Sequence, residues 1–179
     1  MPPLQHEIGK KRPFEEPAQE LFLAIMRTAA VLEADGAQMF RNAELSGATY
    51  NVLRILRGAT IGQDAPGEVT CGHIARHLVS PVPDVTRLID RLEKAGLAER
   101  KRSSSDRRVV YVRVTAAGLK LLAELDEQVL AMHRRQFAHL SKAEMVQLIG
   151  LLEKAREQVT GGAAGQVEEE ADAPRAARR

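Results

Sequence analysis

The sequence contains very few aromatic residues and no tryptophan. Phe, Trp and Tyr together make up 3% of the chain, although 44% of its residues are hydrophobic. The core must therefore be built mostly from Leu, Ile, Val and Ala, and this composition favours a fold rich in helices. A length of 179 residues fits one domain of ordinary size with appended helices.

Cysteine and long apolar runs are also scarce. The single cysteine, Cys71, excludes an intramolecular disulfide and is typical of a reducing compartment. No apolar run approaches the roughly 20 residues that span a bilayer, and residues 1–17 lack the hydrophobic segment of a secretory signal. We therefore expect a soluble, cytoplasmic protein without a membrane partner.

Motifs of catalysis are missing as well. The chain has no nucleophile elbow, no phosphate-binding glycine loop and no pair of acids with a plausible cleft. The serines at 103–105 lie in a predicted loop without a nearby base. We therefore expect neither an enzyme nor a bound cofactor.

A helix is predicted directly after Pro83. Apolar residues recur there at helical spacing and form one stripe, namely Val85, Leu88, Ile89 and Leu92. The opposite face is mainly polar and carries Pro83, Arg87, Asp90 and Lys94. Gly96 follows, and glycine commonly stands just past the end of a helix. The pattern predicts an amphipathic helix with an exposed basic face.

The next segment changes to a strand periodicity. Valine alternates with tyrosine and arginine over residues 110–114, and a polar loop over 101–108 precedes them. Residues 98–113 hold six Lys or Arg against two acids, whereas the whole chain has a formal net charge of only +2. A helix followed by a basic hairpin is a winged helix. Its helix fits the major groove of DNA, and its loop reaches the backbone or the minor groove.

These two motifs resemble the MarR family of bacterial regulators. The family's wing reads Asp-x-Arg, a short strand, then Leu-Thr-x-x-Gly. This chain has Asp106-Arg107-Arg108 and then Val114-Thr115-Ala116-Ala117-Gly118, with valine in place of leucine. Residues 85–93 and the pair Gly96-Leu97 match the family's recognition helix, and a weaker likeness covers roughly Ala18 to Gln158.

The remaining chain places this wing in helix-turn-helix order. We expect the other helices over residues 17–41, with a kink or break at Gly36, over 47–57, over 71–79, over 115–137 and from 141 to near 160. Favourable N-terminal caps for four of them are Ser46, Thr70, Thr115 and Ser141. Residues 59–69 are predicted to form a loop.

The predicted fold is therefore mainly α with a small β-wing: a winged helix-turn-helix domain with N- and C-terminal dimerisation helices. Residues 1–16 are predicted to be a flexible arm, 17–160 a MarR-type domain and 161–179 a disordered tail. Within the domain, the winged helix spans about 45–115 and the dimerisation helices about 17–41 and 116–160. A winged helix is too small to cover the apolar faces of these terminal helices, so we expect a symmetric homodimer. The MarR resemblance implies the same arrangement.

Candidate DNA-binding residues lie on the predicted helix and in the wing. The whole set comprises Pro83, Asp84, Thr86, Arg87, Arg91, Arg102, Ser104, Asp106, Arg107 and Arg108. We expect Thr86, Arg87 and Arg91 to read bases or phosphates, and Asp84 to cap the helix. Asp90 is expected to pair with Lys94 or Arg87. The MarR resemblance implies that Arg108 enters the minor groove, with Asp106 orienting it; alternatively, Asp106 only stiffens the hairpin.

A Cys-x-His-x-x-x-His string also raises two alternatives. His73 and His77 share a helix face at a metal-compatible spacing. With Cys71 they make three candidate ligands, and the sequence offers no fourth one nearby. Cys71 at a helix start is a candidate redox sensor, although it is not at the N-terminal position that some MarR-like sensors use. We expect no metal site here.

The predicted function is a dimeric repressor that binds an inverted repeat in double-stranded DNA and is released by a small ligand. The MarR resemblance implies small, often aromatic or anionic ligands between the dimer helices and the winged domain, such as phenolic or carboxylate compounds. The alternatives are a DNA-binding architectural protein or constitutive regulator without an effector, and a protein-interaction module that reuses the winged-helix shape.

Overall fold

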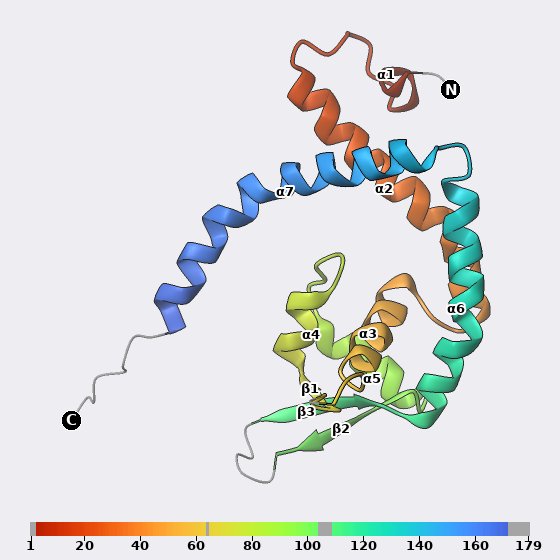
Figure 1. Ribbon diagram of the computed structural model, residues 1–179, viewed down its shortest axis with the longest axis vertical. Coiled ribbons are helices and arrows are strands. Elements are labelled where there is room, and N and C mark those ends of the chain that lie inside the picture. Colours follow the sequence, from red (N-terminus) through yellow and green to blue (C-terminus); the bar gives the residue numbers. More distant parts are fainter. Residues whose placement is uncertain (1–2, 64, 104–108, 172–179) are drawn as a thin grey trace. The chain divides into compact units, whose positions relative to one another are not determined.

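The computed structural model describes residues 3–63, 65–103 and 109–171, with side chains as far as residue 158. The chain forms two compact units, Met1–Met132 and His133–Arg179. The helices and strands follow in the order α1 (Leu4–Glu7), α2 (Pro17–Asn42), α3 (Gly47–Gly58), β1 (Val69–Thr70), α4 (Cys71–His77), α5 (Val85–Lys94), β2 (Ala98–Arg102), β3 (Val110–Val114), α6 (Ala116–Gln136) and α7 (Lys142–Ala171) (Figure 1). The predicted fold class, mainly α with a small β-wing, is confirmed.

The core of the first unit lies between the small sheet and the helices α3, α4 and α5 (Figure 1). Its largest fully buried side chains are all aliphatic, namely Leu53, Leu56, Ile74, Ile89, Leu92, Leu122, Val52 and Val112. Aromatic residues contribute little: Tyr50 belongs to this core, and Phe40 packs against it with the two ring centroids 4.8 Å apart. The shortage of aromatic residues is thus met by close aliphatic packing.

The sheet has three strands in the order β1-β3-β2, and both pairings are antiparallel. β2 and β3 form the predicted hairpin, with Arg100 opposite Val112. β1 includes Val69, which the sequence assigned to a loop, and that assignment is wrong because Val69 pairs with Val112. Its other residue, Thr70, pairs with Tyr111 and also caps α4 as predicted. Two residues are too few to show an alternating pattern, so only the partner strand reveals this one.

Helix α2 runs without interruption through Gly36, where the sequence predicted a kink or break. Gly36 is buried, and a Cβ atom there would lie 2.9 Å from Sδ of Met132 on α6. The glycine therefore permits a close approach of α2 and α6, and the prediction of a break is wrong. Ahead of α2, the short helix α1 is joined to it by an ion pair between Glu7 and Arg27 at 3.3 Å.

The predicted N-terminal caps are found at α3 and α4. The Ser46 hydroxyl accepts a hydrogen bond from the backbone N–H of Thr49 at 3.1 Å, and Thr70 accepts one from His73 at 3.2 Å. α4 ends at His77, slightly before the predicted end. Beyond it, the backbone N–H of Val79 donates to Oδ1 of Asn51 at 2.9 Å, so the turn after α4 is anchored to α3.

The second unit consists of the end of α6 and helix α7. The capping box at Ser141 is present, because the Ser141 backbone N–H and hydroxyl both donate to Glu144, at 2.8 and 2.7 Å. These hydrogen bonds lower the pKa of Glu144. α7 continues to Ala171, past the end near residue 160 that the sequence predicted. Across the part of the chain that the structure describes, no helix combines the length and apolarity needed to cross a bilayer.

Candidate nucleic-acid interface

Helix α5 is amphipathic in the predicted sense. Leu88, Ile89 and Leu92 are buried, whereas Thr86, Arg87, Arg91 and Lys94 are exposed on the other side. The Arg87 side chain is 81% exposed. The helix thus offers a polar face carrying cations, which is the chemistry that reads guanine edges and phosphates in a DNA groove.

The start of α5 is fixed by Asp84. Its carboxylate accepts a hydrogen bond from the backbone N–H of Arg87 at 3.2 Å, which confirms the predicted cap. The same carboxylate lies 3.2 Å from Nε of Arg87. Pro83 is exposed immediately before this cap. Asp84 therefore orders the first turn of α5 and also holds the Arg87 side chain near it.

The end of α5 is joined to both the wing and α6. Gly96 has a φ of +69°, which lets the chain turn from α5 into β2. Thr115 donates through its hydroxyl to the Gly96 carbonyl at 2.7 Å and accepts from the backbone N–H of Gly118 at 3.1 Å. A Cβ atom on Gly118 would lie 2.3 Å from the Leu97 carbonyl oxygen, so only glycine fits. The first turn of α6 is therefore packed directly against the turn that follows α5.

Arg100 on β2 ties the wing to α5. Its Nη1 lies 2.7 Å from Oδ1 of Asp90 and also contacts the carboxylate of Glu93, while Nη2 donates to the Thr86 carbonyl at 3.2 Å. The backbone N–H of Arg100 donates to Glu93 at 2.9 Å. Burial alone would lower the pKa of Arg100, but the hydrogen bond to Asp90 and the charge of Glu93 outweigh it and raise that pKa.

This network corrects two sequence-based expectations. Asp90 does not use Lys94 or Arg87 as its partner, because the Arg100 guanidinium reaches it from β2. Arg100 itself was counted only as part of the basic wing charge, yet its charge is met by two carboxylates. No local spacing signals this contact, since it joins a helix to a strand beyond the turn.

The base of the wing carries further ion pairs. Lys101 lies 3.6 Å from Glu68, and Arg113 lies 2.7 Å from Glu99. Arg102 is exposed at the end of β2. The predicted wing residues Ser104, Asp106, Arg107 and Arg108 lie outside the described residues. Because Arg100, Lys101 and Arg113 all have acidic partners, much of the charge surplus counted in the sequence is neutralised locally.

The Cys-x-His-x-x-x-His string lies on α4, away from this face of α5. Cys71 is a half-buried free thiol. The rings of His73 and His77 stack with their centroids 4.1 Å apart. Over the described ranges, no group of three or more His, Cys, Asp or Glu side chains is arranged to hold a metal ion.

The chain matches the MarR family over residues 60–110. It is 42% identical to a MarR transcription factor of known structure from Planctomyces limnophilus, a likeness that covers 79% of this chain and 98% of that one with a TM-score of 0.59. It is 29% identical over 116 residues to the HTH-type transcriptional repressor IacR of Pseudomonas putida, which corresponds to 59% of this chain and 68% of that protein.

The fold also matches a mutant of MarR from E. coli that was crystallised with operator DNA. That likeness has a TM-score of 0.66 at 23% identity and covers 75% of this chain and 92% of the other. The exposed basic face of α5, the wing beside it and these relatives agree with one another. The chain belongs to the MarR family of DNA-binding winged helix-turn-helix transcriptional regulators.

Proposed function

We propose that this protein is a repressor that binds an inverted-repeat operator in double-stranded DNA as a homodimer and leaves it when a small ligand binds. The observation that carries this proposal is the exposed face of α5, where Thr86, Arg87 and Arg91 lie beside the strand that leads into the basic wing. The relative IacR is a repressor, and the E. coli relative binds operator DNA.

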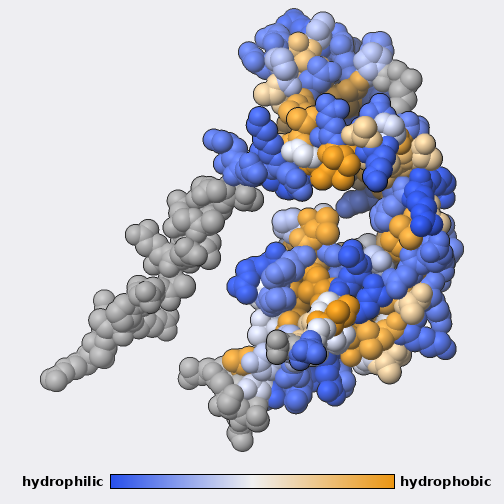
Figure 2. Space-filling view, viewed as in Figure 1, coloured by the Kyte–Doolittle hydropathy of each residue, from blue (hydrophilic) through white to orange (hydrophobic). Residues whose placement is uncertain are grey.

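Exposed apolar residues on α2 support the dimer. Four of its exposed large hydrophobic side chains lie close together, namely Leu21 (57% exposed), Phe22 (63%), Ile25 (36%) and Met26 (56%). They recur at helical spacing and so form one stripe. The space-filling view shows hydrophobic atoms at the surface among hydrophilic ones (Figure 2). Such a stripe on a water-soluble protein is unfavourable unless a partner covers it.

Helix α7, in the second unit, carries apolar residues of the same kind. Val146, Leu148, Ile149 and Leu151 are between 43% and 61% exposed. A second copy of the chain offers the same exposed apolar residues, so a two-fold dimer covers both α2 and α7 without any other protein. The two α5 helices are then related by the same axis, which is why the operator is proposed to be an inverted repeat.

The contacts of α6 support regulation by a ligand. α6 packs on α2 at Gly36 and Met132, and it is joined to α3 by a two-pronged ion pair in which Arg57 lies 2.8 and 2.9 Å from the oxygens of Asp126. The hydrogen bond from Arg57 lowers the pKa of Asp126. The first turn of α6 also lies against the turn after α5, through Gly118 and Leu97, so a shift of α6 is passed to that turn. A ligand that favours a dimer in which the spacing of the two α5 helices does not match the half-sites releases DNA. The size of this effect is limited by the difference in the ligand's affinity for the two states of the dimer.

The test begins with mapping the genomic sites that the protein occupies in its native cell. A duplex carrying the recovered repeat is then compared with a scrambled duplex of equal length at about 0.15 M salt, where screening limits unspecific attraction. We expect binding to the repeat to be at least a hundredfold tighter, with two subunits per duplex. Equal binding to both duplexes would instead identify an architectural DNA-binding protein.

A further inference from the structure

The two oxygen atoms of the Asp84 carboxylate contact the same residue. Oδ1 accepts a hydrogen bond from the backbone N–H of Arg87, and Oδ2 lies 3.2 Å from Nε of the Arg87 side chain. Asp84 is therefore both the N-terminal cap of α5 and the ion-pair partner of an arginine in the first turn of that helix. A single carboxylate thus ties the direction of this side chain to the start of α5.

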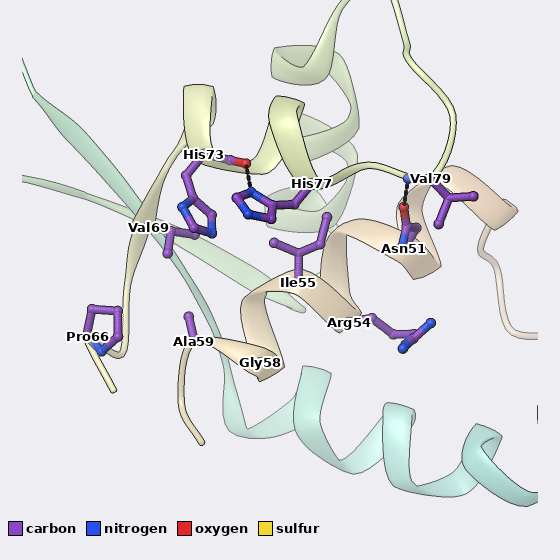
Figure 3. Close-up of a pocket in the computed structure, with 10 residues that line it drawn as sticks. All are labelled: Asn51, Arg54, Ile55, Gly58, Ala59, Pro66, Val69, His73, His77 and Val79. Carbon is purple, nitrogen blue, oxygen red and sulfur yellow. Dashed lines mark hydrogen bonds between the residues drawn. The ribbon is translucent and has the colours of Figure 1, made fainter. Parts of the chain in front are cut away.

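The backbone that leads to Asp84 is also anchored. In the turn between α4 and α5, the backbone N–H of Val79 donates to Oδ1 of Asn51 on α3 at 2.9 Å (Figure 3). The same figure shows a cavity of about 500 Å³ between α3, α4 and β1, with Val79 and His77 among its lining residues. Asp84 ends this turn, so the segment that presents Arg87 is held both at the turn and at the cap.

The ion pair leaves one end of the Arg87 guanidinium available. The contact is made through Nε, and a guanidinium carries four further N–H donors on Nη1 and Nη2. The side chain is 81% exposed, so these donors remain accessible. A pair of such donors matches the O6 and N7 acceptors that guanine presents in the major groove. The N-terminal residues of a recognition helix are the ones that reach base edges.

The negative charge of Asp84 opposes a different use of Arg87. DNA phosphates attract arginine side chains without regard to base sequence. A carboxylate beside the guanidinium offsets part of its charge and is itself repelled by phosphate, whereas an uncharged guanine edge exerts no such repulsion. Binding becomes specific when the wrong contacts are weakened as well as when the right ones are made.

We propose that Asp84 is a positioning residue that makes Arg87 select guanine. It holds the Nε side of the guanidinium, presents the Nη side to O6 and N7 of the base, and lowers the attraction of Arg87 to phosphate. An exposed ion pair of this kind contributes little to the stability of a fold, so its effect is on the choice of DNA sequence. This role rests on the operator binding proposed above, and it assigns a base to one position of each half-site.

The test removes the charge of Asp84 and keeps the cap. In Asp84→Asn, the amide oxygen still accepts from the backbone N–H of Arg87, but the ion pair is lost. The probes are the recovered operator, duplexes carrying each single base change in one half-site, and a scrambled duplex. Affinities are measured at several salt concentrations for the wild type, Asp84→Asn and Arg87→Ala.

We expect the wild type to prefer guanine at the position where Arg87→Ala loses discrimination between bases. Asp84→Asn should lose at least about threefold of this preference. Its affinity for the scrambled duplex should stay the same or rise. The salt dependence of its binding should increase by about one ion, because the released guanidinium then contacts phosphate.

Further variants make the assignment specific. Asp84→Ser also keeps a cap without the charge, so it should behave as Asp84→Asn does. Glu124→Gln neutralises the carboxylate of an exposed ion pair with Lys120 on α6 and should leave the preference for guanine unchanged. In an Arg87→Ala background, Asp84→Asn should not alter that preference further, because the two residues act as one unit. Melting temperatures show whether each variant is folded.

The outcomes separate the role of Asp84 from the proposed function. If the wild type prefers its operator and Asp84→Asn keeps the full preference for guanine, Asp84 is only a cap and the positioning role is wrong. A changed preference at another base position, or the same change without Arg87, would show that Asp84 contacts a base itself, which also overturns that role. A wild type without preference among the duplexes would contradict the operator binding and the guanine selection together.

Discussion

The Arg100 guanidinium and the Glu93 carboxylate are in contact across the turn between α5 and β2, and Glu93 also accepts from the Arg100 backbone. In the sequence, Arg100 counts as part of the basic wing. In the structure, its ion pair with Glu93 instead joins strand β2, at the base of the wing, directly to the recognition helix α5.

Replacing Arg100 should uncouple strand β2 from helix α5. In Arg100→Gln, Asp90 and Glu93 lose their shared cation, and we expect a loss of about 1–3 kcal/mol in stability and a drop in operator affinity. The matched control is Arg113→Gln on the same hairpin, where the exposed pair with Glu99 should contribute below about 1 kcal/mol. Thermal melting and operator titration measure both effects. Equal behaviour of the two variants would contradict the special role of Arg100.

Arg87 is predicted to read a base. Its side chain is 81% exposed and so is free to enter a DNA groove. Arg87→Ala should reduce the discrimination between bases at one position of the half-site by about 1–3 kcal/mol. A panel of operators with single base changes, titrated against wild type and variant, gives the measurement. A uniform loss on all sequences would show that Arg87 contacts phosphate instead.

Arg108 belongs to the wing predicted from the sequence and lies outside the described residues. Arg108→Ala should weaken operator binding at about 0.15 M salt and reduce the salt dependence by about one ion. The fold and the dimer should be unaffected. Lys120→Ala on α6, which removes a cation that is 80% exposed, is the control. Unchanged affinity of the Arg108 variant would remove the wing tip from the interface.

The proposed dimer predicts strong effects of charge on exposed residues. Phe22→Asp on α2 and Leu148→Asp on α7 place a carboxylate where the side chain is already 63% and 43% exposed, so an isolated chain should tolerate them. In a dimer the same carboxylates are buried without a partner, and dissociation should follow. Gln147→Asp, at an exposed polar position of α7, is the control. Sedimentation equilibrium decides, and a monomeric wild type would exclude the dimer.

Gly118 should tolerate no side chain. An added Cβ would meet the Leu97 carbonyl at 2.3 Å and Cγ2 of Val114 at 2.7 Å, so Gly118→Ala should destabilise by about 1–3 kcal/mol. Gly58→Ala in α3 has no atom within 4 Å of the added Cβ and should be neutral or slightly stabilising. Chemical unfolding of the two variants gives the comparison, and equal stabilities would contradict the tight junction at Gly118.

The features predictable from the sequence are the local ones. Asp84, Thr115 and Ser141 were recognisable as caps because a cap bonds a backbone group only a few residues away. The apolar stripe of α5 was recognisable because one period repeats over the whole helix. The family of DNA-binding regulators was predictable because the recognition helix and the wing motif follow each other directly in the chain.

The features that were missed depend on partners distant in sequence. Gly36 was interpreted as a break, but its role is set by Met132, far along the chain on α6. The partner of Asp90 comes from β2, and the cavity at His77 forms only when α3 lies against α4. The local conformational preference of a glycine is the same at a kink and at a close helix contact. Only the tertiary contact with Met132 therefore shows which role Gly36 has.

The pairing of Val69 with Val112 also has a consequence for how the protein folds. These two residues close a loop that contains α4, α5 and β2, so the sheet gains its third strand only after a long-range closure. Such closures are paid for in chain entropy before any contact compensates them, and they slow folding. The two-residue strand β1 is therefore expected to form late, and a newly made chain completes the sheet at the base of the wing only once β3 has emerged from the ribosome.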